Sequence, residues 1–144
     1  KTKEESKRLQ ECFPNIIRDR IQIFHGQLSQ RDYLKRLQSL DLLLMPYLKH
    51  RYYLRTSGVF AEAAAYGIPV IVSEGTWMHR MLNNGFGSGI IFENLSPSCV
   101  CEALVRASDN LPELQHKAGR GMAKWRKEQS TTALVEMLAS KLNQ

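Results

Sequence analysis

The chain has 144 residues, of which 43% are hydrophobic and 24% charged, and its formal net charge is +6. A chain of this length is sufficient for one ordinary domain that buries about 70% of the surface exposed in its unfolded form. The composition excludes a disordered or fibrous protein. No apolar run approaches the roughly 20 residues that a membrane-spanning helix needs.

Hydrophobic periodicity and turn residues predict helices and strands that alternate along the chain. In chain order, the predicted elements are a helix over 3–12, a strand over 21–24, a helix over 29–39, a strand over 41–45, a helix over 57–66, a strand over 70–73, a helix over 77–83, a strand over 90–92, and helices that begin at Ser96, at Pro112 and at Thr131 or Thr132.

Local residues mark the ends of several of these elements. Ser29 and Asp32 make an approximate capping box at the start of a helix. The apolar run that Pro46 halts is typical of a parallel strand buried on both faces. Gly67 stands where a C-terminal helix cap is expected, and Pro97 occupies the first position of a later helix.

This alternation predicts an α/β fold: a doubly wound, Rossmann-like parallel sheet with helices on both faces. We expect a single domain over residues 1–144, because neither a repeat nor a linker interrupts the pattern. Ligands of such sheets bind outside the carboxyl ends of the strands. Functional residues are therefore expected just after Phe24, Met45, Ser73 and Phe92.

The strongest candidate site lies between Pro46 and Glu62, where a basic and aromatic loop leads into a helix that opens with Ser57 and Gly58. The first amides of a helix lack intrahelical acceptors and carry partial positive charge, which suits a diphosphate. Gly58 lets a ligand approach the backbone, and Ser57 can cap the helix or donate to a phosphate oxygen. Glu62, about 6 Å further along the same face, is suited to accept hydrogen bonds from ribose hydroxyls. Capping and dipole effects alone also favour a serine and a glutamate here, so a purely structural interpretation stays open.

Two sequence segments, SGVFAEA at 57–63 and GIPVIVS at 67–73, resemble the signature of group 1 (family 4) glycosyltransferases. The resemblance extends over roughly residues 21–127, with support from His25-Gly26, Asp41 to Pro46 and Gly85 to Gly89. It implies the C-terminal, donor-binding half of a GT-B enzyme, in which two Rossmann-like domains face a cleft. Transfer in this family is usually retaining and independent of metal ions.

The resemblance assigns donor-binding roles to individual residues. Glu62 matches the glutamate that binds the donor ribose, and Ser57, Gly58 and Val59 fall where backbone amides meet the diphosphate. The other residues carried over lie in loops that line the donor site: Gly26, Gly75 and Thr76. Leu54 departs from the family pattern, because a glutamate that contacts the transferred sugar usually stands at this position.

Several residues of the loop before Ser57 keep two interpretations. Arg55 is expected either to bind phosphate or sugar, or to form an exposed salt bridge. The basic residues Lys49, His50 and Arg51 can supplement a cationic clamp or be ordinary loop surface. The loop tyrosines can stack on a base or sugar or pack against the sheet edge: Tyr47, Tyr52 and Tyr53. No residue is assignable as catalytic.

The resemblance further implies that the first strand of the donor domain, its phosphate-neutralising cations and an N-terminal acceptor domain precede this chain. We therefore expect a fragment that is inactive alone, from a hexosyltransferase of cell-envelope or exopolysaccharide synthesis. Its expected partners are a nucleotide sugar and, through the N-terminal domain, an acceptor glycan or lipid-linked sugar.

No cofactor is expected, and histidines and cysteines without ligand spacing predict no metal site. Three cysteines favour the cytoplasm, which is compatible with peripheral association at the inner face of the membrane.

Two alternatives belong to other functional classes. An inactive nucleotide-binding or regulatory module on the same fold would account for Leu54. Nucleic-acid binding would use the charge of +6, because basic surfaces attract polyanions. The sequence contains no recognised nucleic-acid motif, so we expect no nucleic-acid partner.

Overall fold

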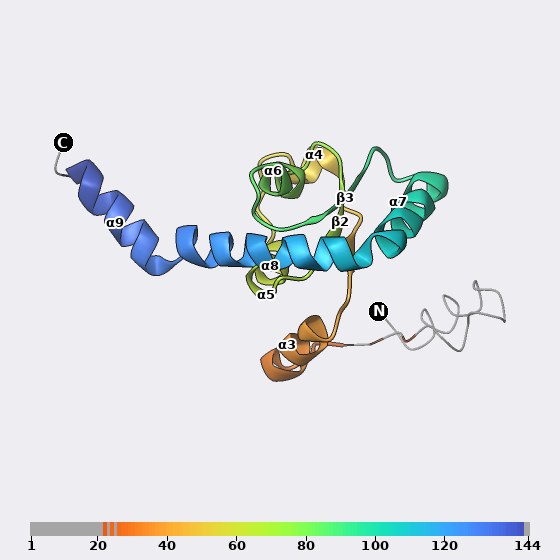
Figure 1. Ribbon diagram of the computed structural model, residues 1–144, viewed down its shortest axis with the longest axis horizontal. Helices are drawn as coiled ribbons and strands as arrows, with labels where there is room; N and C mark the ends of the chain where they lie inside the picture. The colour runs from red at the N-terminus through yellow and green to blue at the C-terminus, as the bar shows by residue number, and fades with distance from the viewer. Residues whose placement is uncertain (1–21, 23, 25, 143–144) are drawn as a thin grey trace. The chain divides into compact units, whose positions relative to one another are not determined.

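The computed structural model describes residues 22, 24 and 26–142 (Figure 1), and the chain divides into two units, Lys1–Arg36 and Leu37–Gln144. The helix predicted over 3–12 lies outside the described residues. The strand predicted over 21–24 does so as well, apart from Gln22 and Phe24, which have no regular secondary structure.

Helix α3 (Gln30–Gln38) begins in the first unit with the predicted capping box. The hydroxyl of Ser29 donates a hydrogen bond to Asp32 Oδ2 over 2.7 Å, and the amide of Asp32 donates to Ser29 Oγ over 3.2 Å. In the same unit, the guanidinium of Arg36 lies 3.5 Å from the centroid of the Phe24 ring, a cation–π contact.

The second unit follows the predicted order of strands and helices closely. Its elements are β1 (Leu43–Met45), α4 (Lys49–Tyr52), α5 (Gly58–Tyr66), β2 (Val70–Ser73), α6 (Trp77–Asn83), β3 (Gly89–Phe92), α7 (Pro97–Asp109), α8 (Leu111–Glu128) and α9 (Thr131–Leu142). Only α4 was not predicted. It is a single turn of polar residues, too short to show hydrophobic periodicity.

The three strands form a parallel sheet in the order β1-β2-β3, in which Ile71 pairs with Leu44 on one side and Ile90 on the other. Helix α7 lies on one side of β2 and β3, and helices α5 and α6 lie on the other (Figure 1). The burial of β2 agrees with helices on both faces of the sheet. Ile71 and its neighbour Val72 point to opposite faces, and neither has any exposed surface. The α/β fold with a parallel, Rossmann-like sheet is thereby confirmed.

Two apolar clusters hold the second unit together. On one face, Ile71 and Phe92 pack with Ala103 and Ala107 of α7 and with Leu114 of α8. The other cluster is aromatic and joins α5, α6 and α8. Its ring centroids lie 5.5 Å apart for Phe60 and Trp77, 6.0 Å for Phe60 and Trp125, and 5.8 Å for Phe86 and Trp125. These clusters fix the helices that carry the candidate site.

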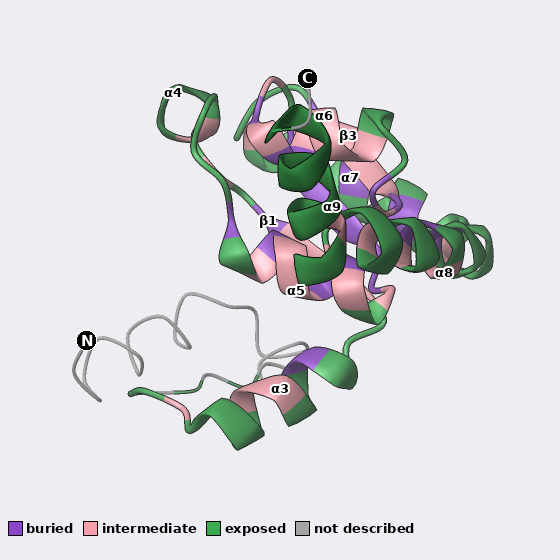
Figure 2. Cartoon of the chain, turned by 90° about the vertical axis from the view of Figure 1, so that its left-hand side faces the viewer, coloured by how far each residue is buried: buried purple, intermediate pink, exposed green. Residues whose placement is uncertain are grey.

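Helix α9 differs from the others in burial, being exposed along almost its whole length (Figure 2). Its large apolar side chains are exposed: Leu134, Val135, Met137, Leu138 and Leu142. Within residues 22, 24 and 26–142, no helix has the length and hydropathy required to cross a bilayer.

Candidate functional site

The predicted site lies where β1 and β2 end. All three strands are parallel, so their carboxyl ends share one edge of the sheet. At this edge, β1 leads through α4 to the start of α5, and β2 leads through a tight turn to α6. The described residues Ser57, Gly58, Gly75 and Thr76 therefore belong to two neighbouring connections at the edge where ligands of such sheets bind.

Ser57 caps α5, as the sequence predicted. Its backbone is extended, with φ of −123° and ψ of 116°, and its side chain accepts a hydrogen bond from the amide of Phe60 over 3.2 Å. The residue is only 6% exposed. Because a serine hydroxyl that accepts one hydrogen bond keeps its own proton for donation, capping does not prevent Ser57 from donating to a phosphate oxygen.

Gly58, the first residue of α5, is exposed, and a Cβ at this position would meet no atom within 4 Å. Packing therefore does not require glycine at position 58. The start of the helix is accessible from outside, which a diphosphate on its first amides needs. Val59, which follows, is half-buried.

Glu62 shares the accessible side of α5 with Gly58. The buried residues of the helix are Phe60, Ala63 and Ala64. At about 100° per residue, Gly58 and Glu62 lie about 40° apart on the helix surface, and both are far from Phe60. Glu62 is half-buried. A carboxylate that is kept off the core and one turn from the open helix start has the placement expected for a ribose ligand.

The turn after β2 is built around Gly75, whose φ of +69° favours glycine. Its amide donates a hydrogen bond to Nδ1 of His79 over 2.9 Å. The side chain of Lys49, from α4, lies directly against this turn, because a Cβ on Gly75 would come 2.8 Å from Lys49 Nζ and closer still to Cε. Lys49 thus brings a cation to the carboxyl edge of the sheet.

Thr76 caps α6 and is fully buried. Its Oγ1 accepts from the amide of His79 over 3.3 Å and donates to the carbonyl of Ser73 over 2.8 Å. With the hydroxyl engaged in both directions, Thr76 supports the shape of the turn rather than offering a free donor.

Aromatic and basic side chains of the loop before α5 pack on one another. The rings of Tyr47 and Tyr52 stack with centroids 4.3 Å apart, and the guanidinium of Arg55 lies 5.7 Å from the Tyr52 ring. Arg80 of α6 donates a hydrogen bond to the carbonyl of Tyr53. Leu54 is 80% exposed. Tyr47 and Tyr52 therefore pack on each other, an arrangement that neither interpretation of these tyrosines included.

Gly26 belongs to the first unit, where it is exposed and has φ of +80°. Its role in lining a donor site stays a prediction.

Sequence reasoning missed His79, although its spacing of four residues from the Gly75 turn was visible. No group of three or more His, Cys, Asp or Glu side chains that could hold a metal ion occurs in the part of the chain that the structure describes.

A parallel α/β sheet with an accessible helix start at its carboxyl edge defines a Rossmann-like domain. The family model of the group 1 glycosyl transferases matches residues 2–110, a range that contains every element from α3 to α7. The chain therefore belongs to the group 1 glycosyl transferases and contains a glycosyltransferase domain of the GT-B type. Comparisons with curated proteins and with solved structures gave no match.

Proposed function

We propose that this domain is the C-terminal, donor-binding half of a family 4 type glycosyltransferase, and that it binds a nucleoside-diphosphate sugar at the start of α5. The observation that carries the proposal is the pairing of Gly58 and Glu62 on the accessible side of that helix. Membership of the group 1 family supplies the reaction class.

Each side chain at the edge has a distinct task in this proposal. The diphosphate accepts hydrogen bonds from the first amides of α5, around Gly58 and Val59, and from the hydroxyl of Ser57. Glu62 accepts hydrogen bonds from the ribose hydroxyls. Lys49, held against Gly75, places positive charge near the diphosphate.

The proposed sugar transfer depends on negative charge that the carboxyl edge of the sheet can stabilise. An acceptor hydroxyl forms a bond to the anomeric carbon on the face from which the diphosphate departs, the bond from that carbon to the diphosphate oxygen breaks, and the hydroxyl proton passes to the departing diphosphate. Negative charge develops on the departing nucleoside diphosphate, so helix amides and a nearby cation stabilise the transition state. We propose that the configuration is retained and that no metal ion takes part.

The acceptor side belongs to the proposed N-terminal domain. We propose a glycan or lipid-linked sugar as acceptor, in cell-envelope or exopolysaccharide synthesis, and a cytoplasmic protein that can associate peripherally with the membrane. Arg55 is proposed to contact phosphate or sugar from its position beside Tyr52.

One observation favours a second candidate, an inactive nucleotide-binding module. Leu54, which is 80% exposed, stands where the family resemblance places the glutamate that contacts the sugar. An exposed apolar side chain cannot replace the hydrogen bonds of a carboxylate. The two candidates share the nucleotide site and differ in turnover by the full-length protein.

Calorimetric titration with a panel of nucleoside diphosphates and their sugars tests the proposal. We expect Glu62→Ala to weaken binding of the preferred nucleotide about tenfold or more, since hydrogen bonds to a charged group are lost. Glu102→Ala, at an exposed position of α7, is the matched control. Equal affinities in both variants would remove Glu62 from the site. Nucleotide binding without sugar transfer by the full-length protein would favour the inactive module.

A further inference from the structure

A hollow with a volume of about 470 Å³ lies along β3, and none of the proposed donor-site residues lines it. Its walls come from the end of α6, the loop that follows, Gly89 and Ile91 of β3, and the middle of α8. Gly89, one of its residues, begins β3. The hollow therefore reaches the amino ends of the strands, opposite the edge that carries Ser57 and Gly75.

All ionisable side chains that line the hollow are cationic: Lys117, Arg120 and Lys124. They stand at intervals of three and four residues on α8, so they share one face of this helix. Lys117 also forms an ion pair of 2.6 Å with Glu113, which does not line the hollow. An excess of positive charge in a concave site favours an anionic ligand.

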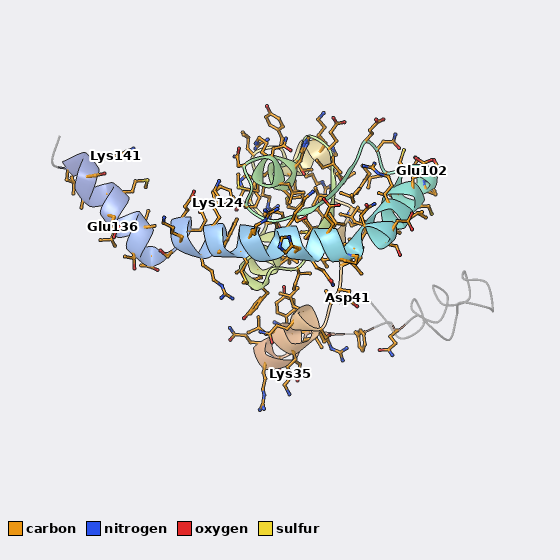
Figure 3. The ribbon with its side chains drawn as sticks, in the orientation of Figure 1. Lys35, Asp41, Glu102, Lys124, Glu136 and Lys141 are labelled. Carbon is orange, nitrogen blue, oxygen red and sulfur yellow. The ribbon has the colours of Figure 1, made fainter. Side chains whose placement is uncertain are left out.

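One of these three cations, Lys124, is held in place by two contacts. Lys124 Nζ donates a hydrogen bond to the carbonyl of Asn84 over 2.6 Å and lies 4.7 Å from the centroid of the Phe86 ring. Figure 3 shows Lys124 projecting from α8 on the side of α6. A side chain that is already ordered loses little conformational entropy when it binds a ligand.

The opposite wall of the hollow offers backbone donors. The carbonyls of Ser88 and Phe92 accept hydrogen bonds from Val70 and Glu74, so alternate residues of β3 face β2. In a parallel ladder the residues between them, Gly89 and Ile91, direct their amides away from β2. Both residues line the hollow, and β3 is an edge strand of the described sheet.

We propose that this hollow binds the phosphate group of a phosphorylated ligand. Arg120 supplies a planar fork of donors that matches phosphate oxygens, and Lys124 adds a fixed point charge. The outward amides of β3 supply further donors from the facing wall. Inorganic phosphate, a soluble phosphate ester and a phospholipid headgroup all present this chemistry.

Titration of inorganic phosphate into the isotope-labelled chain, followed by amide NMR shifts at constant ionic strength, tests the proposal. We expect saturable shifts at Gly87, Ser88, Gly89 and Arg120. Arg120→Gln should weaken binding about tenfold, since it removes charge-assisted hydrogen bonds from an exposed residue. Lys141→Gln, which removes the same charge from α9 outside the hollow, should leave the affinity unchanged.

Two results would overturn the proposal: linear shifts without saturation, or equal weakening by Arg120→Gln and Lys141→Gln. Shifts confined to the start of α5 would also overturn it, while leaving the donor site intact. Phosphatidylcholine vesicles with and without phosphatidic acid identify the source of the phosphate. Binding to phosphatidic acid that depends on Arg120 indicates a lipid headgroup, and phosphate binding without vesicle binding indicates a soluble ligand.

Discussion

Gly121 of α8 lies directly against the backbone of Gly87, so that a Cβ on Gly121 would come 2.6 Å from Gly87 Cα and closer still to its nitrogen. Two glycines thus allow a helix and the loop before β3 to approach more closely than any side chain permits. The contact sets the distance between the cations of α8 and the edge of β3.

Replacing Gly121 by alanine is expected to lower the free energy of unfolding by about 1–3 kcal/mol, because backbone atoms must move to admit a methyl group. Gly119 provides a matched control in the same helix. A Cβ there would meet no atom within 4 Å, so Gly119→Ala should raise the free energy of unfolding by about 0.5–1 kcal/mol. Urea denaturation of the two variants measures both changes, and a Gly121→Ala protein as stable as Gly119→Ala would show that the contact imposes no constraint.

Alanine at Gly58 is expected to leave the fold intact and to weaken binding of a nucleoside diphosphate about tenfold. The space around Gly58 admits a Cβ, so the free energy of unfolding should not fall. The added methyl group would instead keep a diphosphate from the first amides of α5. Calorimetric titration together with thermal unfolding separates the effects. Unchanged affinity in Gly58→Ala would argue against close approach of the ligand at this position.

The hydrogen bond from Gly75 to His79 predicts a local effect that can be measured at one amide. His79→Ala removes the acceptor, and the free energy that protects the Gly75 amide from exchange should fall by about 1 kcal/mol. Asn83→Ala is the control, because Asn83 contacts the other ring nitrogen of His79 at 3.1 Å. Hydrogen exchange at Gly75 should be faster in His79→Ala and nearly unchanged in Asn83→Ala. Equal exchange in all three proteins would show that the turn does not depend on His79.

Both ends of α5 were predictable from the sequence because their signals are local. Ser57 accepts from an amide three residues away, and Gly67 adopts the left-handed conformation of a C-terminal cap, with φ of 69°. Strand positions followed similarly from apolar runs and prolines. The structure leaves the start of α5 accessible and keeps Glu62 off the buried face of this helix, and the donor-binding roles of these residues stay predictions.

Contacts between distant segments left no such local signal. The packing of Lys49 on Gly75 requires the turn of α4, whose four polar residues have no periodicity. The approach of Gly121 to Gly87 depends on how α8 crosses the sheet. Thr76 was predicted in a donor-lining loop from the family resemblance, yet its complete burial and its two hydrogen bonds depend on the folded turn. Tertiary packing, rather than propensity, determines these features.

The ion pair of Glu113 and Lys117 predicts an effect on protonation. The hydrogen bond from Lys117, and then its charge, lower the pKa of Glu113 below the ordinary value. Lys117→Met should therefore raise the pKa of Glu113 towards that value, as carboxyl NMR shifts measured against pH would show. The pKa of Glu113 is lower in the folded protein than in the unfolded chain. The ion pair therefore stabilises the fold at pH values above the unfolded-state pKa. This stabilisation is lost as the pH falls through the lower, folded-state pKa. Because both side chains are at least half exposed, the free energy of unfolding at neutral pH should hardly change. An unchanged pKa in Lys117→Met would show that the pair does not persist in solution, which would leave Lys117 free to face the hollow beside Arg120.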